Sequence, residues 1–89
     1  MQNLELADQY HQDGLALLAE QRVLEAIDAF KQAVDLRADY AAYHKDLALA
    51  YEQSKNRSLA ITCWKNVLEY HRDGELRELA NTHLAQLKY

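Results

Sequence analysis

The chain has 89 residues, which predicts a single domain, and its formal net charge is −4 with no basic run longer than two residues. This charge argues against nucleic acid as a partner, because nucleic-acid binding needs clustered lysine and arginine. The longest apolar stretches are a few residues, far short of the roughly 20 needed to cross a membrane, and the polar N-terminus shows no signal peptide.

The composition predicts an all-helical fold, since the chain has no proline, two glycines and many good helix formers. Apolar residues recur every three to four positions in five segments. Connections of two to four residues force neighbouring helices to run antiparallel. In chain order, the predicted helices span residues 4–20, 23–37, 40–53, 58–71 and 75–88.

Short polar residues at the predicted helix starts are candidate N-caps, because their side chains can accept from free backbone amides. Asn3, Asp39 and Asn56 stand at the starts of the first, third and fourth helices. Asp73 is placed to cap the last helix after the break at residues 72–74.

The chain also matches itself at a spacing of 34 residues. Residues 7–40 align with residues 41–74 at seven identical positions, and most conservative replacements fall where apolar residues recur. A 34-residue period with helical patterning predicts stacked helix–turn–helix units, each too small to bury its own apolar face.

The residues that recur resemble the tetratricopeptide repeat (TPR) family, whose units carry small residues where two helices cross and an aromatic residue toward the next unit. The residues that match this pattern are Gly14, Ala26, Phe30 and Ala33 in the first unit, and Ala48, Ala60 and Trp64 in the second. The departures from it are Asp13 at an apolar position, Arg57 at a tyrosine position, Val67 at a small position, and Ala38 and Arg72 at the usual proline.

The resemblance implies a right-handed superhelical stack of antiparallel helix pairs, a TPR-like α-solenoid with five helices. The first repeat spans about 7–40 and the second about 41–74. The segment of about 75–88 aligns better with the period shortened by two residues, so we expect a capping helix that covers the open end of the stack.

In the TPR family, the first helices of successive units line a concave groove that binds a peptide or helix of a partner protein. Residues at the corresponding positions lie at helical spacing and 34 residues apart between units. We expect three leucines among them to form an apolar patch, which is either free for a partner or covered by the last helix or the N-terminal turn. The groove candidates are Asp8, His11, Leu15, Leu18, Ala42, Lys45, Leu49 and Glu52.

A clamp for the acidic tails of chaperones, another use of the family, is not expected. Leu15 and Leu49 replace the asparagines of such a clamp, and His11 replaces its first lysine, so Lys45 is the remaining positive charge in the groove.

The sequence predicts no enzyme, metal site or cofactor. The histidines at positions 11, 44, 71 and 83 lack metal-ligand spacing, and no phosphate loop or nucleophile motif occurs. His44 is predicted to pack in the core and His83 to be partly exposed. The single cysteine, Cys63, is predicted to pack inside the second hairpin, and it favours a reducing, cytoplasmic setting.

The leading functional hypothesis is therefore an adaptor or scaffold that docks another protein in its groove, without nucleic acid or membrane insertion. The alternative is self-association as a homodimer, through the groove or through an apolar strip on the capping helix. That strip consists of Leu76, Leu79, Leu84, Leu87 and Tyr89. A third interpretation is that the chain is part of a longer protein.

Overall fold

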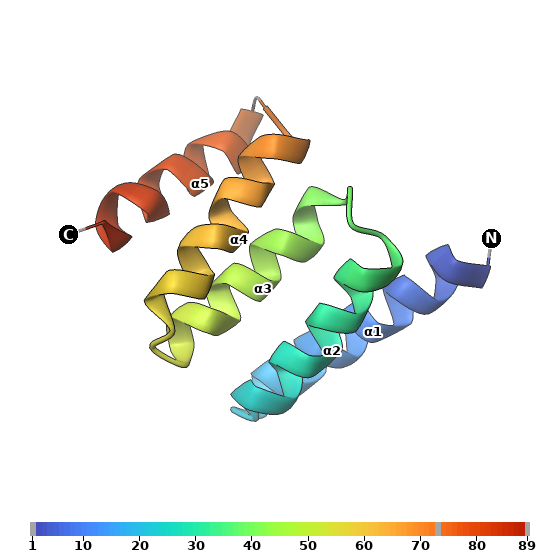
Figure 1. The fold of residues 1–89 in the computed structure, drawn as a ribbon. Coiled ribbons are helices and arrows are strands. Elements are labelled where there is room, and N and C mark those ends of the chain that lie inside the picture. Colours follow the sequence, from blue (N-terminus) through green and yellow to red (C-terminus); the bar gives the residue numbers. More distant parts are fainter. Residues whose placement is uncertain (1, 73, 89) are drawn as a thin grey trace.

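The computed structural model describes residues 2–72 and 74–88, which form five α-helices and no strand (Figure 1). Consecutive helices run antiparallel and pack in adjacent pairs, α1 with α2 and α3 with α4, while α5 packs beside α4. This confirms the all-helical prediction, and each predicted helix end lies within two residues of the observed one. The helices are α1 (Gln2–Ala19), α2 (Val23–Leu36), α3 (Ala41–Gln53), α4 (Arg57–Tyr70) and α5 (Gly74–Leu87).

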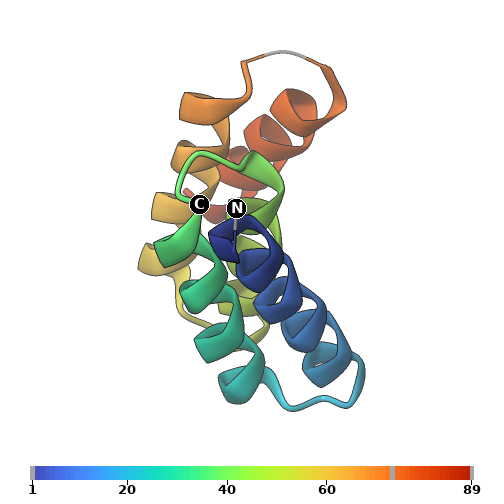
Figure 2. The ribbon, with the colours of Figure 1, turned by 90° about the vertical axis from the view of Figure 1, so that its right-hand side faces the viewer.

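The 34-residue period recurs in the backbone. Helices α2 and α4 begin and end 34 residues apart. The turns before them carry left-handed residues at equivalent positions, Gln21 with φ of 67° and Lys55 with φ of 66°. In both turns, the amide of the next residue donates to the carbonyl five residues earlier over 2.9 Å. The two hairpins therefore close with the same local geometry despite their different side chains, and Figure 2 shows the first of them, α1 and α2, side by side.

The helix starts confirm one predicted cap and correct two others. The Asn56 side chain accepts a 3.3 Å hydrogen bond from the Leu59 amide. Asp39 does not cap α3, because that helix begins at Ala41 and the Asp39 carboxylate lies 3.8 Å from Arg37 instead. Asn3 lies inside the first turn of α1. The predicted cap Asp73 lies outside the described residues.

The hairpins close around an aromatic residue and small partners. Phe30 and Trp64 are fully buried, and so is Ala48 on α3. Gly14 on α1 has no room for a side chain, because a β-carbon there would stand 2.5 Å from the Phe30 ring. Close helix crossing over a flat aromatic surface therefore requires the small residues that the sequence places there.

Helix α5 covers the second hairpin with its apolar side. Ala80 and Leu84 are buried, while Leu76, Leu79 and Leu87 are half-buried against the same core. These leucines, which the sequence offered as a strip for self-association, thus already pack within the chain. Tyr89 of that strip lies outside the described residues.

Candidate interaction surface

Helices α1 and α3 contact each other and carry all eight predicted groove residues. Asp8 is exposed on α1, and Leu15 keeps 38% of its surface exposed. The rest are half-buried, namely His11, Leu18, Ala42, Lys45, Leu49 and Glu52. The structure therefore gives these residues unequal access to a partner.

The first polar contact between α1 and α3 centres on Asp46. Its Oδ2 lies 2.5 Å from His11 Nε2, and its Oδ1 lies 3.5 Å from Lys45 Nζ. The His11 and Asp46 side chains are only 12% and 11% exposed. His11 also packs against Tyr43, with 4.8 Å between ring centroids. His11 is thus engaged inside the protein, whereas the half-buried Lys45 contacts Asp46 from the surface.

Sequence reasoning missed Asp46, although a signal for it was present. Lys45 is the 34-residue counterpart of His11, and Asp46 is the next residue. Because the first helices of two stacked units lie side by side, residues about one period apart can meet. The pairing of Asp46 with His11, 35 residues earlier, could therefore have been predicted from the repeat period.

The second polar cluster joins three helices through Glu52. Its Oε2 accepts a 2.6 Å hydrogen bond from Trp64 Nε1 and lies 2.7 Å from His83 Nδ1. The His83 ring stacks on Trp64 with centroids 4.5 Å apart. Glu52 thus holds α3, α4 and α5 together, and His83, partly exposed as predicted, takes part in this contact.

The groove leucines are neither wholly free nor wholly covered. Leu18 and Leu49 pack at the edge of the main core, which leaves them half-buried. Leu15 stands outside that cluster and is the most exposed of the three. Leu15 is therefore the groove leucine most open to a partner, and Leu18 and Leu49 offer only part of their surfaces.

His44 and Cys63 are packing residues, as the sequence predicted. His44 is buried, its Nε2 lies 2.7 Å from the Ala38 carbonyl, and its ring stacks on Tyr70. Because a carbonyl only accepts, Nε2 carries the proton. Burial raises the pKa of the Cys63 thiol to about 11, so the thiol stays protonated and unreactive at neutral pH.

A hollow of about 350 Å³ opens where the α3–α4 turn meets the end of α5. Its walls are Glu52, Lys55, Arg57 and Leu87. Of these four, only Glu52 was predicted as a groove residue, and Leu87 was expected in the strip for self-association. The others come from a turn and two helix ends that are far apart in sequence, so their meeting depends on how α5 docks.

Across residues 2–72 and 74–88, no three histidine, cysteine or acidic side chains gather in a way that would hold a metal ion. None of the helices described is long and apolar enough to cross a membrane.

No protein-family model matches the chain, and a comparison with curated proteins finds no relative. The functional argument therefore rests on the fold and on the residues of these surfaces.

Proposed function

We propose that the protein is a two-unit TPR-like interaction module that binds a peptide or helix of a partner protein on the face formed by α1 and α3. Support for a repeat module comes from the 34-residue period in both sequence and backbone, and from the small residues packed against Phe30 and Trp64. In such a stack, the first helices of successive units provide a continuous surface for a partner.

The observation that carries this proposal is that Leu15 on α1 is exposed, while Leu18 on α1 and Leu49 on the contacting helix α3 are half-buried. An apolar patch with a polar rim is typical of a surface that receives an amphipathic helix or an extended apolar segment. Asp8 and Lys45 provide charges of both signs at its edge. Hydrophobic burial would supply the affinity, and the rim would select the orientation.

The proposal is tested with Leu15→Glu, because Leu15 lies outside the main core cluster and its replacement should leave the fold intact. Leu24→Glu is the matched control, since Leu24 is 74% exposed on α2, away from this face. Each variant, checked by circular dichroism, and the wild type serve as bait in a lysate of the source cells. We expect a partner that the wild type and the control retain and that Leu15→Glu loses by at least tenfold.

Hydrogen exchange of the resulting complex then locates the interface. Protection is expected in α1 and α3 and not on the outer side of α2. A partner retained equally by all three baits would contradict the proposal, as would protection confined to α2 and α4.

Self-association has weaker support, because the α5 leucines proposed for it are buried or half-buried within the chain. We further propose a cytoplasmic, non-enzymatic role. The buried thiol of Cys63 suits a reducing compartment, and the polar clusters around Asp46 and Glu52 consist of mutually engaged structural pairs.

A further inference from the structure

Charge is divided unevenly along the chain. Residues 1–52 carry ten acidic and four basic side chains, a formal charge of −6, whereas residues 53–89 carry four acidic and six basic side chains, a charge of +2. The segments 53–68 and 79–88 contain no aspartate or glutamate. A protein that is acidic as a whole therefore has one basic region, and such asymmetry indicates a region with its own electrostatic preference.

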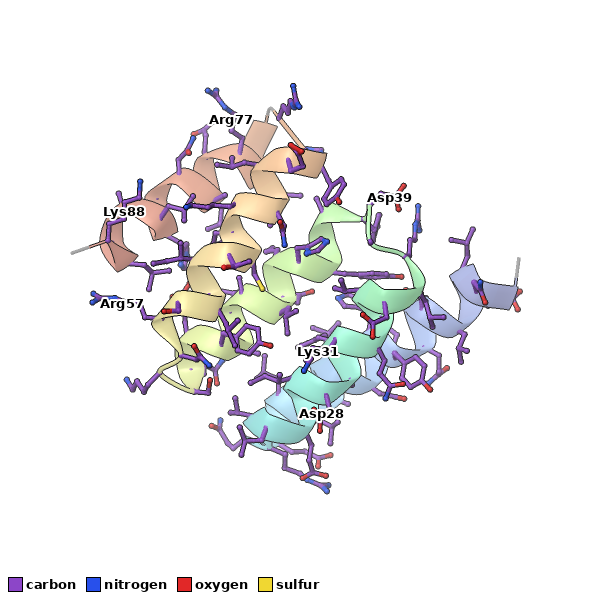
Figure 3. All side chains as sticks on the ribbon, viewed as in Figure 1. Asp28, Lys31, Asp39, Arg57, Arg77 and Lys88 are labelled. Carbon is purple, nitrogen blue, oxygen red and sulfur yellow. The ribbon has the colours of Figure 1, made fainter. Side chains whose placement is uncertain are left out.

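The fold brings these two acid-free segments together at the 350 Å³ hollow. Lys55 lies in the α3–α4 turn, Arg57 begins α4, and Leu87 ends α5. Both cations are exposed, and Lys88 follows Leu87 directly. Figure 3 shows Arg57 and Lys88 along the same edge of the molecule.

Among the residues that the structure describes, Glu52 is the one acidic wall of this hollow, and its carboxylate is hydrogen-bonded by two side chains. Its Oε2 is held by Trp64 Nε1 over 2.6 Å and by His83 Nδ1 over 2.7 Å. These two hydrogen bonds hold the carboxylate toward α4 and α5 and stabilise it as an anion. Lys55 and Arg57 bring two positive charges to the hollow against the one negative charge of Glu52, and Leu87 is its apolar wall.

We propose that this hollow binds an acidic segment of a partner protein, with one carboxylate held between Lys55 and Arg57 and a neighbouring apolar side chain packed on Leu87. This inference rests on the proposed function in one respect, that the occupant is a protein. The hollow itself is a separate site from the surface around Leu15. Arginine and lysine form charge-assisted hydrogen bonds with carboxylates, and the hollow is at the small end of ligand sites. The two cations at this hollow are too few for a nucleic acid, which is bound through many phosphate contacts.

The single tryptophan provides a built-in reporter, because its indole N–H donates to a wall of the hollow. The probe is acetyl-Leu-Glu-Glu-Leu-amide, and its uncharged counterpart is acetyl-Leu-Gln-Gln-Leu-amide. In nitrogen-15 correlation spectra at fixed ionic strength, the acidic probe should shift the Trp64 indole signal saturably. The uncharged probe should bind at least tenfold more weakly.

The decisive variant is Lys55→Gln with Arg57→Gln. Glutamine is accepted at position 55, because Gln21 adopts the same left-handed backbone at the equivalent position of the first hairpin. The control is Lys31→Gln with Lys65→Gln, which removes the same charge from exposed positions on α2 and α4. We expect the first variant to bind the acidic probe at least tenfold more weakly than the wild type does. The control should change the affinity for this probe less than twofold.

Other outcomes overturn the inference in distinguishable ways. Equal loss in both charge variants would indicate a general charge effect. Inorganic phosphate that shifts the indole signal at the same concentration as the peptide would indicate an anion site without preference for protein carboxylates. If the wild type sediments in a concentration-dependent way and Lys55→Gln with Arg57→Gln abolishes this dependence, the occupant is a second copy of the chain. Leu15→Glu should leave probe binding unchanged, so failure of the α1–α3 surface and failure of this site are separable.

Discussion

The two hairpins share one backbone geometry yet bury different residues. Asp13 of the first is exposed and accepts a 3.0 Å hydrogen bond from Gln9, whereas its counterpart Leu47 in the second is only 5% exposed. The second hairpin packs between α2 and α5, while the first has a neighbouring pair on one side. The residue type at an equivalent position thus depends on how many neighbouring helices the hairpin contacts. It depends less on the local helix geometry, which the two hairpins share.

The same contrast appears on α1 and α3, at the predicted groove positions and next to them. Gln12 is exposed in the first hairpin, but its counterpart Asp46 is buried and engaged with His11. Leu18 has Glu52 as its counterpart, and Glu52 is committed to Trp64 and His83. The second hairpin therefore uses Asp46 and Glu52 to join helices, and the first hairpin leaves more of its predicted groove residues exposed.

The largest expected effect on stability comes from truncating the two core aromatic residues, Phe30 and Trp64, one in each hairpin. Phe30→Ala should cost about 3–5 kcal/mol of unfolding free energy from lost burial and the remaining cavity. Trp64→Ala should cost about 1 kcal/mol more, because it also removes the donor to Glu52 and leaves that carboxylate less satisfied. Guanidinium unfolding followed by circular dichroism measures both. A larger loss for Phe30→Ala would contradict the central role of the second hairpin.

Asp46→Ala should have the next largest effect, about 1–3 kcal/mol, because it leaves the half-buried His11 without its acceptor. The matched change Gln12→Ala, at the equivalent exposed position, should stay within about 0.5 kcal/mol of the wild type. Urea unfolding followed by Trp64 fluorescence reports both values. Equal effects at the two positions would show that the contact between α1 and α3 adds nothing to stability.

Gly14→Ala gives the smallest and most distinctive effect. Alanine favours a helix by about 1 kcal/mol over glycine, but the new methyl would press into the buried Phe30 ring, at a cost of about 1–3 kcal/mol. We expect net destabilisation of about 1 kcal/mol, measured by thermal unfolding. Ala48→Gly at the equivalent position should also destabilise, since alanine already fits there. A stabilised Gly14→Ala variant would show that Phe30 can move away.

Much of the fold was predictable because it depends on local rules. Apolar spacing predicted the ends of five helices to within two residues, and the short polar side chain of Asn56 correctly predicted the N-cap of α4. The prediction of Asp39 as a cap was wrong because α3 begins one residue later than expected, with Tyr40 at the N-cap position. The groove prediction placed eight residues on two touching helices, yet it could not tell that Glu52 points toward the cap helix and its histidine.

The sequence by itself determined the helices, because these follow from apolar spacing within a few turns of chain, and it determined the 34-residue period, because the chain repeats its own pattern. The small-against-aromatic packing was expected from the residues that resemble the TPR family. Only the tertiary structure decided which charges are engaged and which are open. The Glu52–Trp64–His83 cluster and the hollow beside Lys55 and Arg57 both require α5 to dock at one angle on the second hairpin. That angle results from the combined packing of many apolar contacts, which no short stretch of the sequence encodes.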